Sequence, residues 1–135
     1  ANADEWRPNA PVSKLLLDAP CSALGTLRRH PEGAWIKREA EIDRFPTAQA
    51  RLLAAAADMV VSGGTVIYCV CTPLKSEGLE IVEGALSNGL YTRHAIEPDE
   101  IPGFEHCLTE AGDLLTIPSE GAGHDAFFIT RLTRL

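Results

Sequence analysis

The sequence has few aromatic residues, a shortage of cations and no long apolar run. Aromatic residues make up 6% of the 135 residues, and 12 Lys and Arg residues stand against 19 Asp and Glu residues, a formal net charge of −7. Such a chain is poorly suited to nonspecific binding of nucleic acid, because contact with phosphates needs a net positive surface. No apolar run approaches the roughly 20 residues that cross a bilayer, so a transmembrane segment is excluded.

The first residues lack two further features. No basic segment followed by an apolar stretch marks a secretory signal, so we expect a cytoplasmic protein that contacts no membrane. The first residue is Ala rather than Met, and we expect the chain to be part of a longer protein. Its length fits one domain, since a domain holds roughly 100–200 residues.

The four cysteines are too few for a disulfide framework in a chain of this length without a secretory signal. They are Cys21, Cys69, Cys71 and Cys107. Cys69 and Cys71 form a Cys-x-Cys pair that could bind zinc together with Cys21, but the two Cys-x-x-Cys pairs typical of structural zinc sites are missing. We therefore expect no metal ion. For Cys107 we predict the ordinary use of cysteine, as a small core residue.

Two apolar runs and two amphipathic segments alternate along the first two thirds of the chain. Residues 14–18 and 65–71 predict buried strands, because they are apolar without alternation. Between them we expect a helix capped by Thr47 and ended by Gly63-Gly64. A second helix is predicted from Ser76 until Asn88-Gly89.

The last third of the chain predicts a loop and two more strands. Residues 94–104 are rich in Pro, Asp and Glu, whereas residues 114–117 and 126–132 resemble strands. Residues 118–123 form a connector short enough for antiparallel pairing. The order β-α-β-α followed by two strands predicts an α/β domain with a mostly parallel sheet and a late antiparallel strand pair.

Reactive side chains follow both predicted inner strands. Asp18 and Cys21 come after the first strand, and Cys71 ends the second. Ligands of open α/β sheets bind outside the carboxyl ends of the strands, so two thiols and a carboxylate are predicted to converge there, each beside a proline (Pro20 or Pro73) that stiffens the backbone. The spacing alone supports equally well two buried cysteines and an aspartate that caps a helix. Of Cys69 and Cys71, which share a face, only Cys71 is expected to reach a cleft.

Four motifs in order resemble the C-terminal part of the RNA 5-methylcytosine methyltransferases of the Sun (RsmB) type. They are Asp-Ala-Pro-Cys-Ser-Ala-Leu-Gly at residues 18–25, residues 26–31 with Trp35, Tyr-Cys-Val-Cys-Thr at residues 68–72, and the closing residues 123–129. Departures from the family pattern are Ala23 and Ala126 in place of glycine, Val70 and Thr72 beside Cys71, and the degraded acidic stretch at residues 76–79.

The resemblance implies a Rossmann-like, S-adenosylmethionine-dependent methyltransferase fold. Residues 1–135 would be the C-terminal portion of a single catalytic domain, because the glycine-rich loop and the acidic residue that hold the cofactor should precede residue 1. A third family aspartate corresponds to Asn2 or Asp4. By itself, the chain is expected to bind the cofactor poorly and not to turn over.

The resemblance also implies roles for individual residues. Cys71 would attack carbon 6 of cytosine, Cys21 would aid release of the RNA adduct, and Asp18 would face either the cytosine edge or the methionine end of S-adenosylmethionine. Pro20 would lie at the RNA, which we expect to be small-subunit ribosomal RNA. Two other readings stay open, a non-catalytic scaffold or RNA-binding module and a Cys-based metal or redox domain.

Several other residues carry weaker signals. Arg28 and Arg29 directly follow the reactive loop, and we predict that they contact RNA phosphates. For residues 37–44, with mixed charges, we expect a solvated loop and helix. Three residues are predicted as core aromatics rather than stacking platforms, and His124-Asp125 as a turn rather than a proton relay. The aromatics are Trp35, Phe127 and Phe128.

Overall fold

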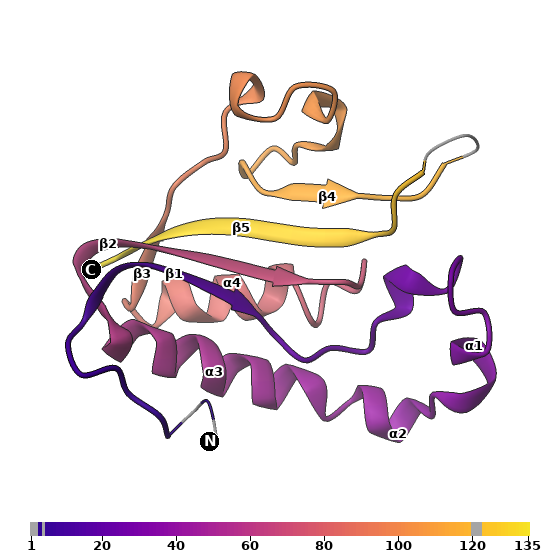
Figure 1. Cartoon of the computed structure of the whole chain (residues 1–135), viewed down its shortest axis with the longest axis horizontal. Helices are drawn as coiled ribbons and strands as arrows, with labels where there is room; N and C mark the ends of the chain where they lie inside the picture. Colours follow the sequence, from indigo (N-terminus) through magenta and orange to yellow (C-terminus); the bar gives the residue numbers. More distant parts are fainter. Residues whose placement is uncertain (1–2, 4, 120–122) are drawn as a thin grey trace.

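A computed structural model describes residue 3, residues 5–119 and residues 123–135 (Figure 1). Asn2 and Asp4, the two candidates for the third family aspartate, lie outside the described residues, as do residues 120–122 of the predicted connector. In the described part of the chain, no helix combines the length and apolar character that a membrane crossing needs.

Five strands form one sheet (Figure 1). The strands are β1 (Val12–Asp18), β2 (Val60–Val70), β3 (Tyr91–Arg93), β4 (Leu114–Thr116) and β5 (Phe127–Arg134). Their order is β1-β2-β5-β3, and β4 also pairs with β5. β1 and β2 run parallel, whereas β5 runs antiparallel to β2, β3 and β4.

This topology confirms the α/β class and the late antiparallel pair, formed by β4 and β5. The expectation of a mostly parallel sheet is wrong for the described residues, where the sheet is mixed and only the β1–β2 pairing is parallel. An apolar run predicts burial on both faces of a strand, but it carries no information on the direction of its neighbour. Here β5 returns from the end of the chain to lie beside β2.

Helices α3 (Phe45–Met59) and α4 (Leu79–Ser87) pack against the buried side chains of β2 (Figure 1). Two single-turn helices, α1 (Gly33–Ile36) and α2 (Glu39–Ile42), precede α3 and add no residue to this core. Short 3-10 turns occur at Leu24–Thr26, Pro98–Glu100 and Glu105–Cys107. Val66, Tyr68 and Val70 alternate along β2 and join Leu53 of α3 and Val82 of α4 in one core. This core fixes the carboxyl end of β2 in space.

The predicted helix boundaries are partly wrong. α3 begins at Phe45 rather than after Thr47, and it ends at Met59, so Gly63-Gly64 lies inside β2. β-Branched Val60 and Val61 favour an extended backbone directly after the helix. The pairing of β2 with β1 shifts register between Val60 and Thr65, and Gly63, with φ +79°, lies in this irregular stretch. α4 is capped by Gly78 instead of Ser76, and it ends before Asn88 as predicted.

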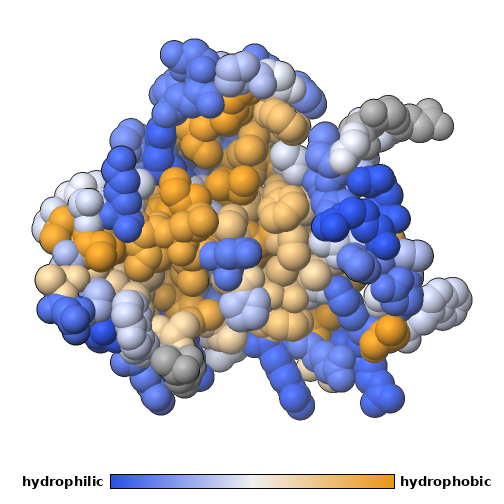
Figure 2. Space-filling model, viewed as in Figure 1, coloured by the Kyte–Doolittle hydropathy of each residue, from blue (hydrophilic) through white to orange (hydrophobic). Residues whose placement is uncertain are grey.

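Apolar side chains remain exposed along β1, an edge strand among the described residues (Figure 2). Leu16 is 69% exposed, and Val12 and Val61 are exposed at the starts of the paired strands β1 and β2. Nearby, a pocket of about 280 Å³ lies between β1 and α3, lined in part by Leu16, Trp6 and Met59. Contiguous apolar surface of this kind marks a contact region.

Candidate active site

Two loops meet at the carboxyl ends of β1 and β2. We call residues 18–25, which leave β1, the first site loop, and residues 71–78, which leave β2, the second site loop. Ala19 N–H donates to Cys69 O at 3.1 Å, and Gly25 N–H donates to Cys71 O at 3.0 Å. The first site loop is therefore tied to the end of β2 at both of its ends.

The predicted pair of thiols does come together. Cys21 Sγ and Cys71 Sγ lie 3.3 Å apart, and both residues are half-buried. Burial, reinforced by the hydrogen bond with Cys71, raises the pKa of Cys21 to about 12. Cys21 is thus a neutral thiol at neutral pH and can donate its S–H to the Cys71 sulfur. The arrangement suits a nucleophile with an attendant proton donor.

Asp18 has a different setting on the same rim. Its side chain is exposed, and the Cys69 thiol donates to Asp18 Oδ1 at 3.7 Å. Burial, with a further contribution from the Asp18 charge, raises the pKa of Cys69 to about 11. Cys69 therefore turns toward Asp18 rather than toward the thiol pair. Among the described residues, no three His, Cys, Asp or Glu side chains are grouped to hold a metal ion.

A buried polar network lies beneath the thiols, and the sequence analysis missed it. Glu77 and Gln49 are both 0% exposed. Glu77 Oε2 accepts from Ser22 N–H at 2.8 Å and from Gln49 Nε2 at 2.9 Å. The signals were present, since Gln49 interrupts the apolar face that continues with Leu53, and Glu77 is the one acidic residue kept in the degraded acidic stretch at residues 76–79.

Hydroxyl groups add a second link between the two site loops. Ser22 Oγ donates to Thr72 Oγ1 at 3.1 Å, and Thr72 Oγ1 also accepts from Leu74 N–H at 3.3 Å. Ser22 and Thr72 are the residues that follow the two cysteines, and both are buried. Thr72 stands where the family has serine, and it keeps the hydroxyl that these contacts need.

Glycine is required where the first site loop passes between Ala126 and the start of the second site loop. A Cβ added at Gly25 would lie 2.2 Å from Ala126 O and 2.8 Å from Cys71 O. Ala126 N–H in turn donates to Gly25 O at 3.0 Å. Ala23, one of the departures from the family's glycines, has a left-handed backbone with φ 54°, which explains why glycine suits that position.

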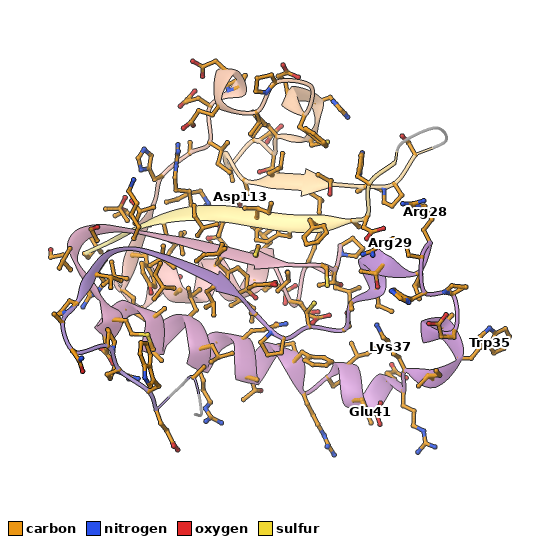
Figure 3. All side chains as sticks on the ribbon, viewed as in Figure 1. Arg28, Arg29, Trp35, Lys37, Glu41 and Asp113 are labelled. Carbon is orange, nitrogen blue, oxygen red and sulfur yellow. The ribbon has the colours of Figure 1, made fainter. Side chains whose placement is uncertain are left out.

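The two predicted phosphate contacts lie beside the rim and share an anion (Figure 3). Arg29 Nε donates to the buried carboxylate of Asp125 at 2.6 Å, and Arg28 lies 3.8 Å from the same carboxylate. The Arg29 contact lowers the pKa of Asp125. Roughly half of each arginine side chain stays exposed, 48% for Arg28 and 54% for Arg29. Asp125 thus pairs with arginine rather than with a thiol.

One expectation near this rim is wrong, and the solvated loop and helix predicted for residues 37–44 is found except at Lys37. Trp35 is 91% exposed and points away from the molecule, because the single turn of α1 has no partner to cover it (Figure 3). Lys37 is not a solvated side chain, since its Nζ donates to Ser22 O in the first site loop. In contrast, Phe128 and Cys107 are buried as predicted, and Pro20 is exposed on the rim.

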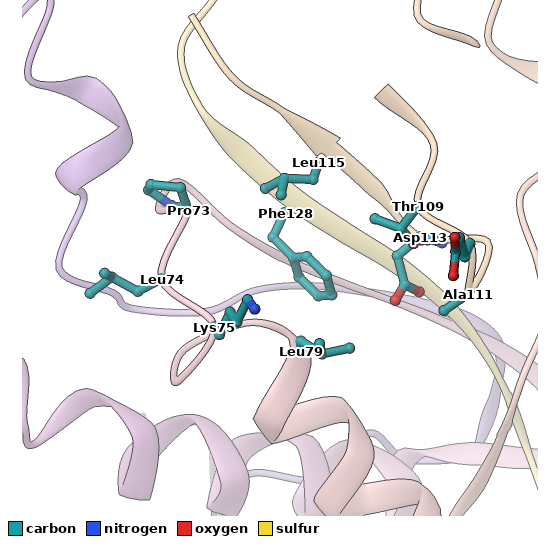
Figure 4. Close-up of a pocket in the computed structure, with 10 residues that line it drawn as sticks. Pro73, Leu74, Lys75, Leu79, Thr109, Ala111, Asp113, Leu115 and Phe128 are labelled. Carbon is teal, nitrogen blue, oxygen red and sulfur yellow. Dashed lines mark hydrogen bonds between the residues drawn. The ribbon is translucent and has the colours of Figure 1, made fainter. Parts of the chain in front are cut away.

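An apolar pocket of about 330 Å³ adjoins the second site loop on the side of β5 (Figure 4). Pro73 and Leu74 line it from the loop, Leu79 from α4, and Phe128 from β5. Asp113 borders it, but Asp113 Oδ1 already accepts from Thr130 at 2.5 Å. The thiols do not line this pocket.

Comparisons with known sequences give matches along almost the entire chain. A model of the family described as 16S rRNA methyltransferase RsmB/F matches residues 1–133. Ribosomal RNA small subunit methyltransferase B of Pectobacterium atrosepticum is 33% identical over 97% of this chain and 28% of that protein. Its namesake in Cronobacter sakazakii is 37% identical over 96% of this chain and 28% of that protein. The chain spans little more than a quarter of these relatives.

Solved structures agree with the fold. The crystal structure of PH0851 has a TM-score of 0.78 and 30% identity, over 91% of this chain and 27% of that one. The crystal structure of NSun6 from Pyrococcus horikoshii with SFG has a TM-score of 0.71 and 23% identity, over 94% of this chain and 31% of that one. These likenesses confirm the fold class that the resemblance implied.

Proposed function

Because the chain belongs to the RsmB/F family of 16S rRNA methyltransferases, we propose that it supplies the cysteine-bearing part of an enzyme that methylates carbon 5 of a cytosine. The methyl donor is S-adenosylmethionine, and the substrate is small-subunit ribosomal RNA. The observation that carries the proposal is the pair of sulfurs 3.3 Å apart at the carboxyl ends of two inner strands. The chain alone is proposed to be inactive, since it spans 28% of the curated relatives.

The domain assignment is a further part of the proposal. We propose that residues 1–135 form the C-terminal portion of a single catalytic domain. The exposed Leu16 on edge strand β1 supports this, because an apolar edge is stabilised when further strands or helices cover it. The remaining contacts to the cofactor would come from other parts of the full-length protein.

Asp18 fits a cationic or amino group on the open side of the site. Its carboxylate is exposed, and it carries a charge that the ammonium or sulfonium of S-adenosylmethionine, or the amino edge of cytosine, would complement. When bound, S-adenosylmethionine supplies an electrophilic methyl group on a sulfonium. Asp18 would then orient whichever of these groups lies against it.

Cys71 makes the cytosine ring reactive. Its sulfur would add to carbon 6 as a thiolate, and the electrons of the double bond between carbons 5 and 6 would move to carbon 5. Carbon 5 would take the methyl group while the bond from that methyl group to the sulfonium sulfur breaks, and the donor sulfur would keep the electron pair of that bond. A base then removes the proton from carbon 5, the ring double bond returns, and the bond from carbon 6 to sulfur breaks. The S–H of Cys21, 3.3 Å away, stabilises the departing Cys71 thiolate.

A dithiol redox couple is the second candidate, because the same sulfur separation suits reversible disulfide formation. The test is methyl transfer by the full-length protein that carries residues 1–135, with labelled S-adenosylmethionine and unmethylated 16S rRNA. We expect labelled 5-methylcytosine on nucleoside analysis, and none with Cys71→Ala. Absence of the product in the unmodified protein would contradict the proposal and favour the redox couple.

A further inference from the structure

We propose that Glu77 and Gln49 are positioning residues that hold Cys21 beside Cys71 for release of the RNA adduct. This inference rests on the proposed function, in which Cys21 assists the departure of the Cys71 sulfur. Neither side chain lies at the surface, since both are 0% exposed. They act through the backbone on either side of Cys21.

Gln49 holds the residue before Cys21. A single nitrogen, Gln49 Nε2, donates both to Pro20 O at 2.9 Å and to Glu77 Oε2 at 2.9 Å. Gln49 lies on α3, the long helix that packs into the core under β2. Pro20 is thereby held by a residue of a rigid helix rather than by another loop.

Glu77 holds the residue after Cys21. Glu77 Oε2 accepts the Ser22 N–H at 2.8 Å, and the Glu77 backbone oxygen accepts from the Tyr68 hydroxyl at 2.6 Å. Tyr68 is a fully buried residue of β2, the strand that leads to Cys71. Pro20 is therefore fixed to α3 by Gln49, and Ser22 is fixed by Glu77, which is itself tied to α3 through Gln49 and to β2 through Tyr68.

The chemistry of the network is unusual for a group that only stabilises a core. Burying a carboxylate and an amide costs free energy unless their polar atoms are satisfied. Within the described residues, Glu77 Oε1 and Gln49 Oε1 have no hydrogen-bond partner. An apolar pair would avoid that cost, whereas only acceptors and donors at these positions can hold Pro20 O and Ser22 N–H.

Loss of the network should affect one step of the reaction. Cys71 ends a core strand and would still attack cytosine, but Cys21 would drift from the 3.3 Å contact that serves release. Displacement by about 1 Å can slow an enzymatic step on the order of a hundredfold. The covalent adduct should then accumulate on ordinary cytosine, as it should with Cys21→Ala.

The experiment compares four variants of the full-length protein that carries residues 1–135. Gln49→Leu and Glu77→Ala break the network, and Glu77→Gln keeps an oxygen that can accept both hydrogen bonds. The matched control is Tyr91→Phe, which removes a buried donor to Leu53 O at 2.8 Å, remote from both cysteines. The readouts are kcat and KM for methyl transfer, the melting temperature, and the fraction of denaturation-resistant complex with unmodified RNA.

We expect Gln49→Leu and Glu77→Ala to lower kcat by about tenfold to a hundredfold, to leave KM nearly unchanged and to accumulate the complex. Glu77→Gln should restore most of kcat, and Tyr91→Phe should change the melting temperature alone. The inference is overturned if Gln49→Leu melts at a lower temperature but keeps the kcat and adduct level of the unmodified protein. Should Glu77→Ala not fold, Gln49→Leu decides by itself.

Failure of the proposed function gives a separate result. RNA that contains 5-fluorocytosine traps the attacking cysteine without any need for release, because fluorine replaces the proton that must leave carbon 5. If the unmodified protein forms no complex with this RNA, the proposed function fails. If it does form the complex, but the network variants behave like the unmodified protein on ordinary cytosine, the proposed function stands and only the positioning role fails.

Discussion

The two sides of the candidate site are built in opposite ways. On the thiol side, the segments that carry Cys21 and Cys71 are held by hydrogen bonds among buried residues, namely Ser22, Thr72, Gln49 and Glu77. On the carboxylate side, Asp18 is exposed at the end of edge strand β1, with the Cys69 thiol 3.7 Å away. The proposed covalent chemistry depends on the placement of two sulfurs, which the fold of this chain holds 3.3 Å apart. The side that carries Asp18, proposed to face either the cofactor or the cytosine edge, is left open.

This difference predicts that substitutions on the thiol side change stability and activity together. Substitutions at Asp18 should change activity alone. The predictions below test the contrast, from the largest effect to the smallest.

Gly25→Ala should damage the thiol side most. The added Cβ would lie 2.2 Å from Ala126 O, a backbone atom that cannot move independently. We expect a loss of about 3 kcal/mol in the free energy of unfolding, measured by denaturant titration, together with loss of methyl transfer. Gly84→Ala is the control, since a Cβ there meets nothing within 4 Å. Equal stability of the two variants would show that the loops are not tightly joined.

Asp18→Asn should separate activity from stability. In the proposed function Asp18 orients the group that lies against it, and loss of such positioning slows turnover on the order of a hundredfold. Because Asp18 is exposed, we expect the melting temperature to stay within a degree or so of the unmodified value. Methyl transfer and thermal melting measured on the same preparation check this. A large drop in melting temperature would mean that Asp18 supports the fold in the way that the residues of the thiol side do.

Thiol alkylation should depend steeply on pH. The pKa of Cys69 is raised to about 11 and that of Cys21 to about 12, so at pH 8 both are almost entirely neutral. We expect Cys69 to react with iodoacetamide on the order of a hundredfold more slowly than an ordinary thiol with a pKa of about 8.5. Its rate should rise about tenfold per pH unit up to its pKa. Peptide mass mapping measures each cysteine, and rapid labelling at pH 8 would contradict the assignment.

Arg28 and Arg29 repeat the contrast on a smaller scale, since Arg29 is held by Asp125 and Arg28 only approaches it. Loss of either should reduce the slope of log affinity against log salt by about 0.7, the value for one phosphate of single-stranded RNA. Only Arg29→Ala should also lower stability. Arg38→Ala, at an exposed cation nearby, serves as control. Slopes equal to that of the unmodified protein would leave both arginines without a role in RNA binding.

Ala23→Gly should give the smallest effect, an increase in the free energy of unfolding. Ala23 has a left-handed backbone with φ 54°, and a residue with a Cβ is strained there. Relief of this strain, less the entropy that glycine loses on folding, should stabilise the fold by about 0.5–1 kcal/mol. Denaturant midpoints measure it. A loss of stability would show that the first site loop relaxes around Ala23 without strain.

The sequence predicted the side chains at the strand ends better than the framework that holds them. Asp18, Cys21 and Cys71 could be placed together because carboxyl ends of parallel neighbours share one edge. The mixed sheet could not be foreseen, since β5 pairs with β2 across some 60 residues and strand direction leaves no local trace. The catalytic roles of Asp18, Cys21 and Cys71 remain predictions.

The buried network was missed for a related reason. A polar residue such as Gln49 on an apolar helix face indicates a buried hydrogen bond, but its partner Glu77 is 28 residues away. Trp35 was placed in the core because tryptophan is usually well buried, and the single-turn helix α1 gives it nothing to pack against. Lys37 looked solvated within a run of mixed charges, yet it reaches Ser22 O.

The central claim is that Cys71 is the sulfur that bonds to the pyrimidine, with Cys21 beside it as helper. The most direct measurement is peptide mass spectrometry of the complex between the full-length protein and RNA that contains 5-fluorocytosine. We expect the nucleotide on the peptide that contains Cys71, no complex with Cys71→Ala, and a stable complex with Cys21→Ala. A nucleotide attached to Cys21, with trapping that survives Cys71→Ala, would contradict the account.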